Sequence, residues 1–173
     1  DTKSNHDFWA YMVSQVPEGG IWLGMYFSRK QEDRLGRFEL DKLQLQKHTK
    51  EKSMKFLHAD EDSFCEQIQS ADVIYIAGGE TSLLWEVLSR KNDSREYFML
   101  KKVYAGSSAG AQVLCGECIN SDGSFFKGYN IIPTSILVHH CSPDEKYKLK
   151  QDTSRISKPV LMLHETQFTV IEV

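Results

Sequence analysis

The amino-acid sequence predicts an α/β fold built around a mainly parallel sheet. Two segments, residues 72–88 and 102–114, repeat the order strand, glycine-rich turn, helix. The first of these strands, Asp72–Ala77, is apolar without alternation, which is typical of a strand buried on both faces of a parallel sheet. Helical and strand-like patterns also alternate along the rest of the chain, and this alternation indicates βαβ units.

The chain opens with a predicted helix over residues 5–16, in which Phe8, Met12 and Val16 recur at every fourth position. Pro17 then ends the helix. Four further elements are predicted before the first glycine turn. They are a strand at 21–27, a helix favoured over an extended form at 38–50, a strand at 54–58 and a helix at 60–70 with acidic residues in its first turn.

The second half contains the two strand–turn–helix segments and three later strands. The predicted strands are 72–77, 102–105, 135–139, 159–163 and 168–173; the predicted helices are 83–88, 112–114 and a polar helix between the strands at 135–139 and 159–163. In a parallel sheet, ligand sites lie at the carboxyl ends of the strands. Both glycine turns occupy such ends, so we expect the functional site there.

Length and composition indicate one globular domain over residues 1–173. The chain is 40% hydrophobic and 26% charged, with a net charge of −3. This acidic balance excludes a general polyanion-coating protein, and no nucleic-acid partner is expected. No apolar run approaches the roughly 20 residues of a membrane span, and no signal-peptide pattern opens the sequence. We therefore expect a cytoplasmic protein without a membrane partner.

The cysteines are expected to be ordinary thiols of a reducing compartment. They are Cys65, Cys115, Cys118 and Cys141. A metal site in which Cys141 with His139 and His140 completes the C-x-x-C pair of Cys115 and Cys118 is the less favoured alternative, because a zinc ribbon needs a second C-x-x-C pair. A thioredoxin-like redox role is disfavoured as well, since the single C-x-x-C comes where a helix is predicted to end.

The motif Gly106-x-Ser108-x-Gly110 is the pattern of a nucleophile elbow, a sharp strand-to-helix turn that exposes a serine hydroxyl. Small neighbours let the strand and helix backbones approach, and the helix start offers free N–H groups to a developing negative charge. The N–H of Ala109 is then a natural oxyanion-hole donor. Two alternatives remain: a turn with a merely solvent-facing serine, and a phosphate-binding turn.

A serine nucleophile requires a base, and the histidine pair after strand 135–139 is the best placed. Adjacent strand residues point to opposite faces, so only one of His139 and His140 can face Ser108. His164 also follows a strand and is a competing candidate. The three others, His6, His48 and His58, are expected to be surface or helix residues. For the acid that orients the imidazole, Asp122 and Glu165 are the candidates.

Together, three motifs resemble the aspartyl dipeptidase/cyanophycinase family of serine peptidases. These are Gly78-Gly79-Glu80-Thr81 after an apolar strand, Gly106-Ser107-Ser108-Ala109-Gly110-Ala111, and a histidine after Ile136-Leu137-Val138. The resemblance covers residues 54–173 well and the first fifty in outline. It implies a three-layer sandwich like the class I glutamine amidotransferases (flavodoxin-like), with a first strand that would precede Asp1.

The resemblance also assigns roles to residues of this sequence. Ser108 is similar to the nucleophile, His140 to the base and, more loosely, Asp122 to the acid. Gly79 would be the second oxyanion donor beside Ala109. The substrate-binding candidates are Glu80, Thr81 and Glu165. The family's Gly-Gly-Asn or Gly-Gly-Asp is Gly-Gly-Glu here, so the longer Glu80 would either bind a substrate amine or repel an acidic side chain.

The expected function is therefore a serine hydrolase that cleaves peptide bonds of small peptides through an acyl-enzyme. This chemistry requires no metal or organic cofactor. The expected partner is a small peptide substrate, and the expected state is a monomer or homodimer. An α/β-hydrolase esterase is one alternative, although only 65 residues follow Ser108. A non-catalytic small-ligand-binding module with the same fold is the other.

Overall fold

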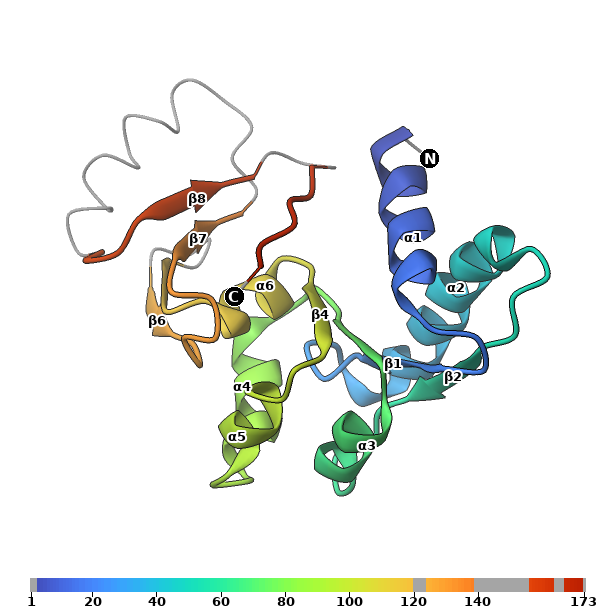
Figure 1. Cartoon of the computed structure of the whole chain (residues 1–173). Helices are drawn as coiled ribbons and strands as arrows, with labels where there is room; N and C mark the ends of the chain where they lie inside the picture. Colours follow the sequence, from blue (N-terminus) through green and yellow to red (C-terminus); the bar gives the residue numbers. More distant parts are fainter. Residues whose placement is uncertain (1–2, 120–123, 139–155, 164–166, 173) are drawn as a thin grey trace. The chain divides into compact units, whose positions relative to one another are not determined.

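The computed structural model describes residues 3–119, 124–138, 156–163 and 167–172. It divides into two compact units, residues 1–110 and residues 111–173. Each unit has its own four-stranded sheet (Figure 1). Whether the two units fold as one domain over 1–173 is not tested by this division, so that expectation stays a prediction.

In the first unit, all neighbouring strands of the sheet are parallel. The strand order is β2-β1-β3-β4, and the bounds are β1 Ile21–Met25, β2 Lys55–His58, β3 Val73–Ile76 and β4 Val103–Gly106. All four strands confirm the sequence prediction to within two residues at each end. Because parallel strands end at the same edge, the residues that follow β1, β3 and β4 lie along one edge of the sheet.

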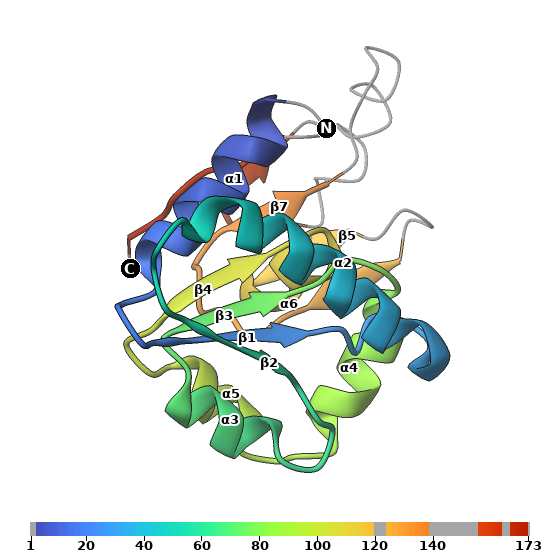
Figure 2. The same ribbon diagram turned by 90° about the vertical axis from the view of Figure 1, so that its right-hand side faces the viewer.

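Helices cover both faces of this sheet, which gives the predicted three layers. The bounds are α1 Lys3–Gln15, α2 Gln31–Thr49, α3 Phe64–Ser70, α4 Thr81–Ser89 and α5 Ser94–Phe98. Figure 2 shows α1 and α2 on one side of the sheet and α3 and α5 on the other. The sequence did not predict α5, because five residues are too few to show a helical period.

The helix predicted from Asp60 begins later, at Phe64. The Asp60 carboxylate accepts hydrogen bonds from the N–H groups of Asp62 and Ser63 at 3.0 and 3.2 Å. Such bonds from a short acidic side chain to the backbone two or three residues on close a turn rather than a helix. The prediction was therefore right about the helix and wrong about its first four residues.

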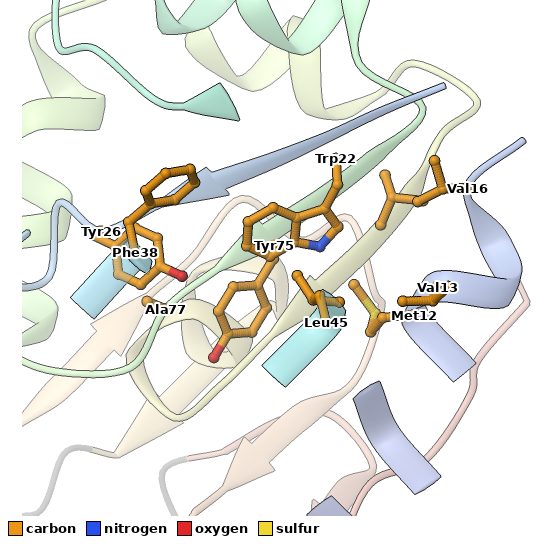
Figure 3. Packing of buried hydrophobic residues seen from close by; sticks show 10 residues of the cluster. Met12, Val13, Val16, Trp22, Tyr26, Phe38, Leu45, Tyr75 and Ala77 are labelled. Carbon is orange, nitrogen blue, oxygen red and sulfur yellow. The ribbon is translucent and has the colours of Figure 1, made fainter. Parts of the chain in front are cut away.

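An aromatic core joins the sheet to α1 and α2 (Figure 3). Trp22 is fully buried, and its ring stacks on Tyr75 with centroids 5.7 Å apart. Met12 of α1 and Val16, which directly follows α1, belong to the same core, which confirms the apolar spacing read from the sequence. Burying a large side chain contributes about 1.5–3 kcal/mol, so this face accounts for much of the first unit's stability.

One carboxylate lies inside this largely apolar layer. Asp41 of α2 is 2% exposed. Its Oδ2 accepts a hydrogen bond from the Tyr26 hydroxyl at 2.9 Å, and its Oδ1 lies 3.3 Å from Nη2 of Arg37. Burial raises the pKa of Asp41 above its usual value, although Arg37 and the Tyr26 hydroxyl both act to lower it. The folded protein therefore binds a proton at Asp41 more tightly than the unfolded chain does.

This raised pKa predicts how stability depends on pH. The stability linked to it is complete below the unfolded pKa of about 3.9 and is lost as the pH rises through the higher folded pKa. The asparagine of Asp41→Asn does not ionise in this pH range. We therefore expect the free energy of unfolding to fall more in the wild type than in this variant as the pH rises from about 4. Urea unfolding across the pH range measures the difference. Asp33→Asn, at an exposed position of α2, is the control; parallel wild-type and Asp41→Asn profiles would contradict the prediction.

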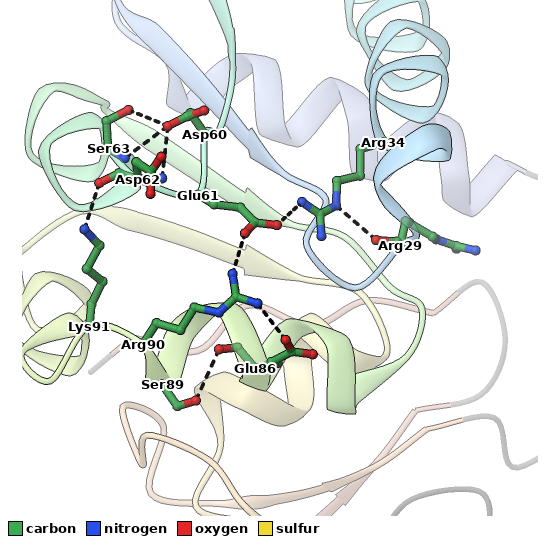
Figure 4. Close-up of polar contacts among 10 residues, drawn as sticks. All are labelled: Arg29, Arg34, Asp60, Glu61, Asp62, Ser63, Glu86, Ser89, Arg90 and Lys91. Atoms are coloured by element: carbon green, nitrogen blue, oxygen red, sulfur yellow. Dashed lines mark hydrogen bonds and ion pairs between the residues drawn. The ribbon is translucent and has the colours of Figure 1, made fainter.

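Glu61, which follows β2, pairs with arginines from two helices (Figure 4). One carboxylate oxygen contacts Arg34 of α2, and the other lies 2.8 Å from Arg90 at the end of α4. Arg90 also contacts Glu86 of α4 at 2.6 Å. The pairs made by the exposed Arg90 contribute at most about 1 kcal/mol each, whereas the Arg34 side chain is only 12% exposed. Together the pairs connect the loop with both helices.

The second unit has a smaller mixed sheet with the order β6-β5-β7-β8. The bounds are β5 Glu117–Ile119, β6 Phe125–Lys127, β7 Ser135–Leu137 and β8 Val160–Met162. The β5–β7 and β7–β8 pairs are parallel, and the β5–β6 pair is antiparallel. The predicted strands at 135–139 and 159–163 are confirmed in shorter form, whereas β5 and β6 were missed. The polar helix predicted between β7 and β8 falls largely outside the described residues.

Both cysteines of the C-x-x-C motif lie in the core of the second unit. Cys115 and Cys118 are free thiols that pack with Ile136. Burial raises their pKa values to about 12 and about 11. Such thiols stay protonated at neutral pH and are poor metal ligands and poor nucleophiles, which supports the expectation of ordinary buried thiols.

The strand predicted at 168–173 is wrong. Residues 167–172 form no regular secondary structure, and Phe168, Val170 and Ile171 are 38%, 52% and 41% exposed. The apolar composition suggested a strand, but a strand also needs a neighbouring edge to receive its backbone hydrogen bonds. No such pairing reaches these residues, so composition alone gave the wrong result.

Candidate active site

Ser108 adopts a backbone conformation that serine rarely takes. It lies between the end of β4 and the start of α6 (Ala109–Leu114), and its φ is +48°. Among the described residues, only Lys50 and Asn130 also combine a side chain with positive φ. The left-handed region costs a residue with a Cβ roughly 1–2 kcal/mol. The surrounding structure must therefore hold this strained serine in place.

Close packing against the end of β3 supplies that restraint. A Cβ added to Gly110 would lie 2.1 Å from the carbonyl oxygen of Ile76, so only glycine fits at this position. The same Ile76 oxygen accepts a hydrogen bond from the Ser107 N–H at 3.0 Å, and the Gly110 N–H donates to the Ser107 oxygen at 2.9 Å. The turn that carries Ser108 is thus tied both to itself and to the neighbouring strand.

The second glycine turn, between β3 and α4, packs directly against the first. A Cβ added to Gly78 would meet the carbonyl oxygen of Ser107 at 3.0 Å and the Cβ of Ser108 at 3.1 Å. Gly79 has a φ of +153°, which residues with side chains rarely adopt, and it is exposed. The sequence placed both turns at the same sheet edge, and the structure brings them into contact.

The two neighbouring serines of the turn differ in their surroundings. Ser107 is hydrogen-bonded to the hydroxyl of Tyr75, which is buried in the core. Burial first, and the Asp41 charge second, raise the pKa of Tyr75, while the hydrogen bond with Ser107 lowers it by less. Tyr75 is therefore a neutral phenol that engages Ser107, and Ser108 is the serine that occupies the strained position.

The other predicted residues fall into two groups. Ala109 is the first residue of α6 and is fully buried, so its N–H belongs to the first turn, where donors have no partner within the helix. Glu80 is exposed and Thr81 half-buried, at the start of α4. The remaining candidates lie outside the described residues: Asp122, His139, His140, Cys141, His164 and Glu165.

His58 is not the surface or helix residue that the sequence suggested. It ends β2, is half-buried, and its ring stacks on Tyr26 with centroids 5.9 Å apart. Burial lowers its pKa. In the order β2-β1-β3-β4, three strand spacings of about 4.8 Å separate β2 from β4. His58 therefore lies about 14 Å across the sheet from the strand that leads to Ser108, too far to act as its base.

Sequence reasoning missed Ser28, the buried residue that contacts the second glycine turn. Ser28 lies three residues after the end of β1, and its carbonyl oxygen accepts a hydrogen bond from the Glu80 N–H at 2.8 Å. The available signal was positional: Ser28 follows a parallel strand, as both glycine turns do. A single serine without a motif did not stand out from the sequence.

Comparisons with known proteins identify a family for most of the chain. A model of the family described as Peptidase family S51 matches residues 37–172. A comparison with curated protein sequences gives no match. Among the described residues, no helix combines the length and apolar character needed to cross a membrane.

Several solved structures share the fold, among them two peptidases. One is a candidate peptidase E from Listeria monocytogenes EGD-e, with 17% identity and a TM-score of 0.63 over 94% of this chain and 87% of that one. The other is a peptidase from an acI-B1 Actinobacterium, with 20% identity and a TM-score of 0.56 over 94% of this chain and 75% of that one. At these identities the likeness shows the fold alone.

Proposed function

The chain belongs to peptidase family S51, a family of serine peptidases, and on that basis we propose that it hydrolyses peptide bonds of small peptides with Ser108 as nucleophile. The observation that carries this assignment is the backbone of Ser108, with its φ of +48° between β4 and α6. A strained residue persists where its surroundings over-determine it, and such residues cluster at active sites. No other described serine has a positive φ.

The proposed reaction is acyl transfer. A base removes the Ser108 hydroxyl proton while Oγ attacks the peptide carbonyl carbon, and the carbonyl oxygen becomes an oxyanion. The N–H groups of Gly79 and Ala109 stabilise this charge. The protonated base then donates its proton to the leaving amine as the C–N bond breaks. Water repeats the sequence on the acyl-enzyme and releases the acid.

For the base and its acid partner, the proposal rests on sequence alone. We assign the base to His140, which follows the segment Ile136–Val138, and the acid to Asp122. His139 and His164 remain alternatives for the base. A triad acid holds the imidazole in the correct tautomer and stabilises its cation, which is the role proposed for Asp122.

Substrate recognition is proposed for Glu80, Thr81 and Glu165. The support from the described residues is the place of Glu80, an exposed acid that directly follows Gly79. A carboxylate there would either attract the protonated amine of a peptide or repel an acidic side chain next to the scissile bond. A panel of short peptides that differ in their first residue separates these two readings.

The domain organisation, cellular compartment, partners and oligomeric state of the enzyme are also proposed. A single domain over 1–173 is supported by the family match, which runs across the boundary between the two units. The free thiols of Cys65, Cys115 and Cys118 support a reducing compartment such as the cytoplasm. The net charge of −3 supports the absence of a nucleic-acid partner. A monomeric or homodimeric state rests on the sequence expectation only.

Labelling with a fluorophosphonate tests the nucleophile, because this reagent phosphonylates activated serines. We expect mass spectrometry to find the adduct on Ser108 in the wild type and in Ser107→Ala, and no adduct in Ser108→Ala. Ser107→Ala is a matched control because it alters the adjacent serine. Loss of labelling in Ser107→Ala with labelling retained in Ser108→Ala would contradict the assignment, and a wild type that is not labelled would favour the ligand-binding alternative.

The same reaction separates the candidate bases. Removing the base that deprotonates Ser108 slows labelling, since general-base catalysis contributes about 10²–10⁴-fold. We expect this slowing in His140→Ala, with near wild-type rates in His139→Ala and His164→Ala. A slow His139→Ala variant and a fast His140→Ala variant would move the assignment to the neighbouring residue.

A further inference from the structure

Ser28 connects the end of β1 to three residues of the second glycine turn, Ala77, Gly78 and Glu80. It is 1% exposed. Its Oγ lies 2.9 Å from the carbonyl oxygen of Ala77 and 3.0 Å from that of Gly78. Its own carbonyl oxygen accepts a hydrogen bond from the Glu80 N–H at 2.8 Å. Ser28 is thus hydrogen-bonded to the residue that directly precedes Gly79 and to the residue that directly follows it.

These contacts set the direction of the Gly79 N–H. A serine hydroxyl has one proton, which Ser28 shares between the two carbonyl oxygens. The Gly78–Gly79 peptide is planar and trans, so its C=O and N–H point in opposite directions. Because the Gly78 carbonyl is drawn towards Ser28, the Gly79 N–H points away from Ser28.

The opposite side of this turn is the one that meets the Ser108 turn. A Cβ built on Gly78 would contact the Ser107 oxygen and the Ser108 Cβ. A Cβ built on Gly79 would instead lie 2.3 Å from the Ser28 carbonyl oxygen. The glycine pair is therefore held between Ser28 on one side and the strained serine on the other.

A glycine pair would not keep this orientation unaided. Glycine populates positive and negative φ about equally, so the peptide between Gly78 and Gly79 can rotate by about 180° at little steric cost. The rotated form would offer a carbonyl oxygen where the N–H had been. It would lose an oxyanion donor and add a repulsive dipole in its place.

We propose that Ser28 is a positioning residue that holds the Gly78–Gly79 peptide with its N–H directed into the oxyanion hole. This rests on the proposed function, in which the Gly79 N–H is one of the two donors. Ser28 touches neither the substrate nor the reacting atoms. It acts through the orientation of one peptide group, and its effect appears in the transition state, where the negative charge develops.

Ser28→Ala tests the proposal, because it removes Oγ and leaves the carbonyl contact to Glu80. Losing an oxyanion donor costs about 10²–10³-fold in turnover, and a partly rotated peptide should lose part of that. We expect kcat to fall about 10–100-fold while KM stays within about twofold, the signature of an interaction made only in the transition state. A peptide aldehyde, whose adduct with Ser108 carries the oxyanion, should bind more weakly by a similar factor.

Ser94→Ala is the matched control. Ser94 is also buried, at 3% exposed, and its Oγ donates to the Leu88 carbonyl at 2.8 Å, at the far end of α4. Both variants remove a buried hydroxyl that serves a backbone carbonyl, so both should lose some stability. Of the two, only Ser28→Ala should have a lower kcat than the wild type. Ser28→Thr keeps the hydroxyl, so its kcat should be close to that of the wild type. If Ser28→Ala does not fold, Ser28→Cys keeps the size with a weaker donor and should show the same fall in kcat.

Two results would overturn the inference. One is an equal kcat in Ser28→Ala and Ser94→Ala; the other is a rise in KM at unchanged kcat. Failure of the proposed function looks different, because either the wild type would hydrolyse no peptide or Ser108→Ala would hydrolyse peptides at the wild-type rate. If kcat fell in Ser108→Ala and stayed unchanged in Ser28→Ala, only the positioning role of Ser28 would be rejected.

Discussion

Ser108→Ala is expected to lower kcat/KM for peptide hydrolysis by about 10⁴–10⁶-fold, the loss typical of removing a serine nucleophile. The fold should be retained, because Ser108 is only half-buried and alanine removes a single oxygen. Steady-state kinetics on the best peptide of the panel measure the loss. Hydrolysis by Ser108→Ala within tenfold of the wild type would remove Ser108 from the mechanism.

Ser108→Gly extends this prediction to stability. Glycine has no Cβ to strain at a φ of +48°. The greater freedom of glycine in the unfolded chain offsets part of this relief. We expect Ser108→Gly to be as inactive as Ser108→Ala and about 0.5–1 kcal/mol more stable. A Ser108→Gly variant less stable than Ser108→Ala would contradict the strained backbone on which the assignment depends.

Gly110→Ala is expected to cost both stability and activity. The added Cβ would lie 2.1 Å from the oxygen and 2.7 Å from the carbon of the Ile76 carbonyl. Both are backbone atoms of Ile76, the last residue of β3, so α6 and the turn must move away. Overpacking of this kind costs about 1–3 kcal/mol or more, and a displacement of about 1 Å at a reacting group costs about 10²-fold in rate. Urea unfolding and peptide kinetics measure the two effects.

Gly36→Ala is the control for this substitution. Gly36 lies in α2, and a Cβ added there has no atom within 4 Å. Because alanine favours a helix over glycine by about 0.5–1 kcal/mol, this variant should be slightly more stable than the wild type and equally active. If Gly110→Ala matched Gly36→Ala in stability and in activity, the β4–α6 turn would have space for a Cβ at residue 110, and the prediction would be wrong.

Several elements were predictable because their residues carry a local signal. A strand buried on both faces must be apolar along its whole length, and β3 is. A turn that brings a strand and a helix together needs small residues, and Gly106–Gly110 supplies them. The same reasoning failed at 168–173, where apolar composition was present but a partner strand was not.

Local patterns in this chain therefore specify the parallel sheet, the two glycine turns and the serine at the strand-to-helix junction. They do so because burial, backbone geometry and helix starts restrict residue types within a few positions. The contact between the two turns and the role of Ser28 emerge only from the folded chain. The hydroxyl of Ser28 meets carbonyls 49 and 50 residues further along, and a pairing over that distance leaves no periodicity or spacing in the sequence.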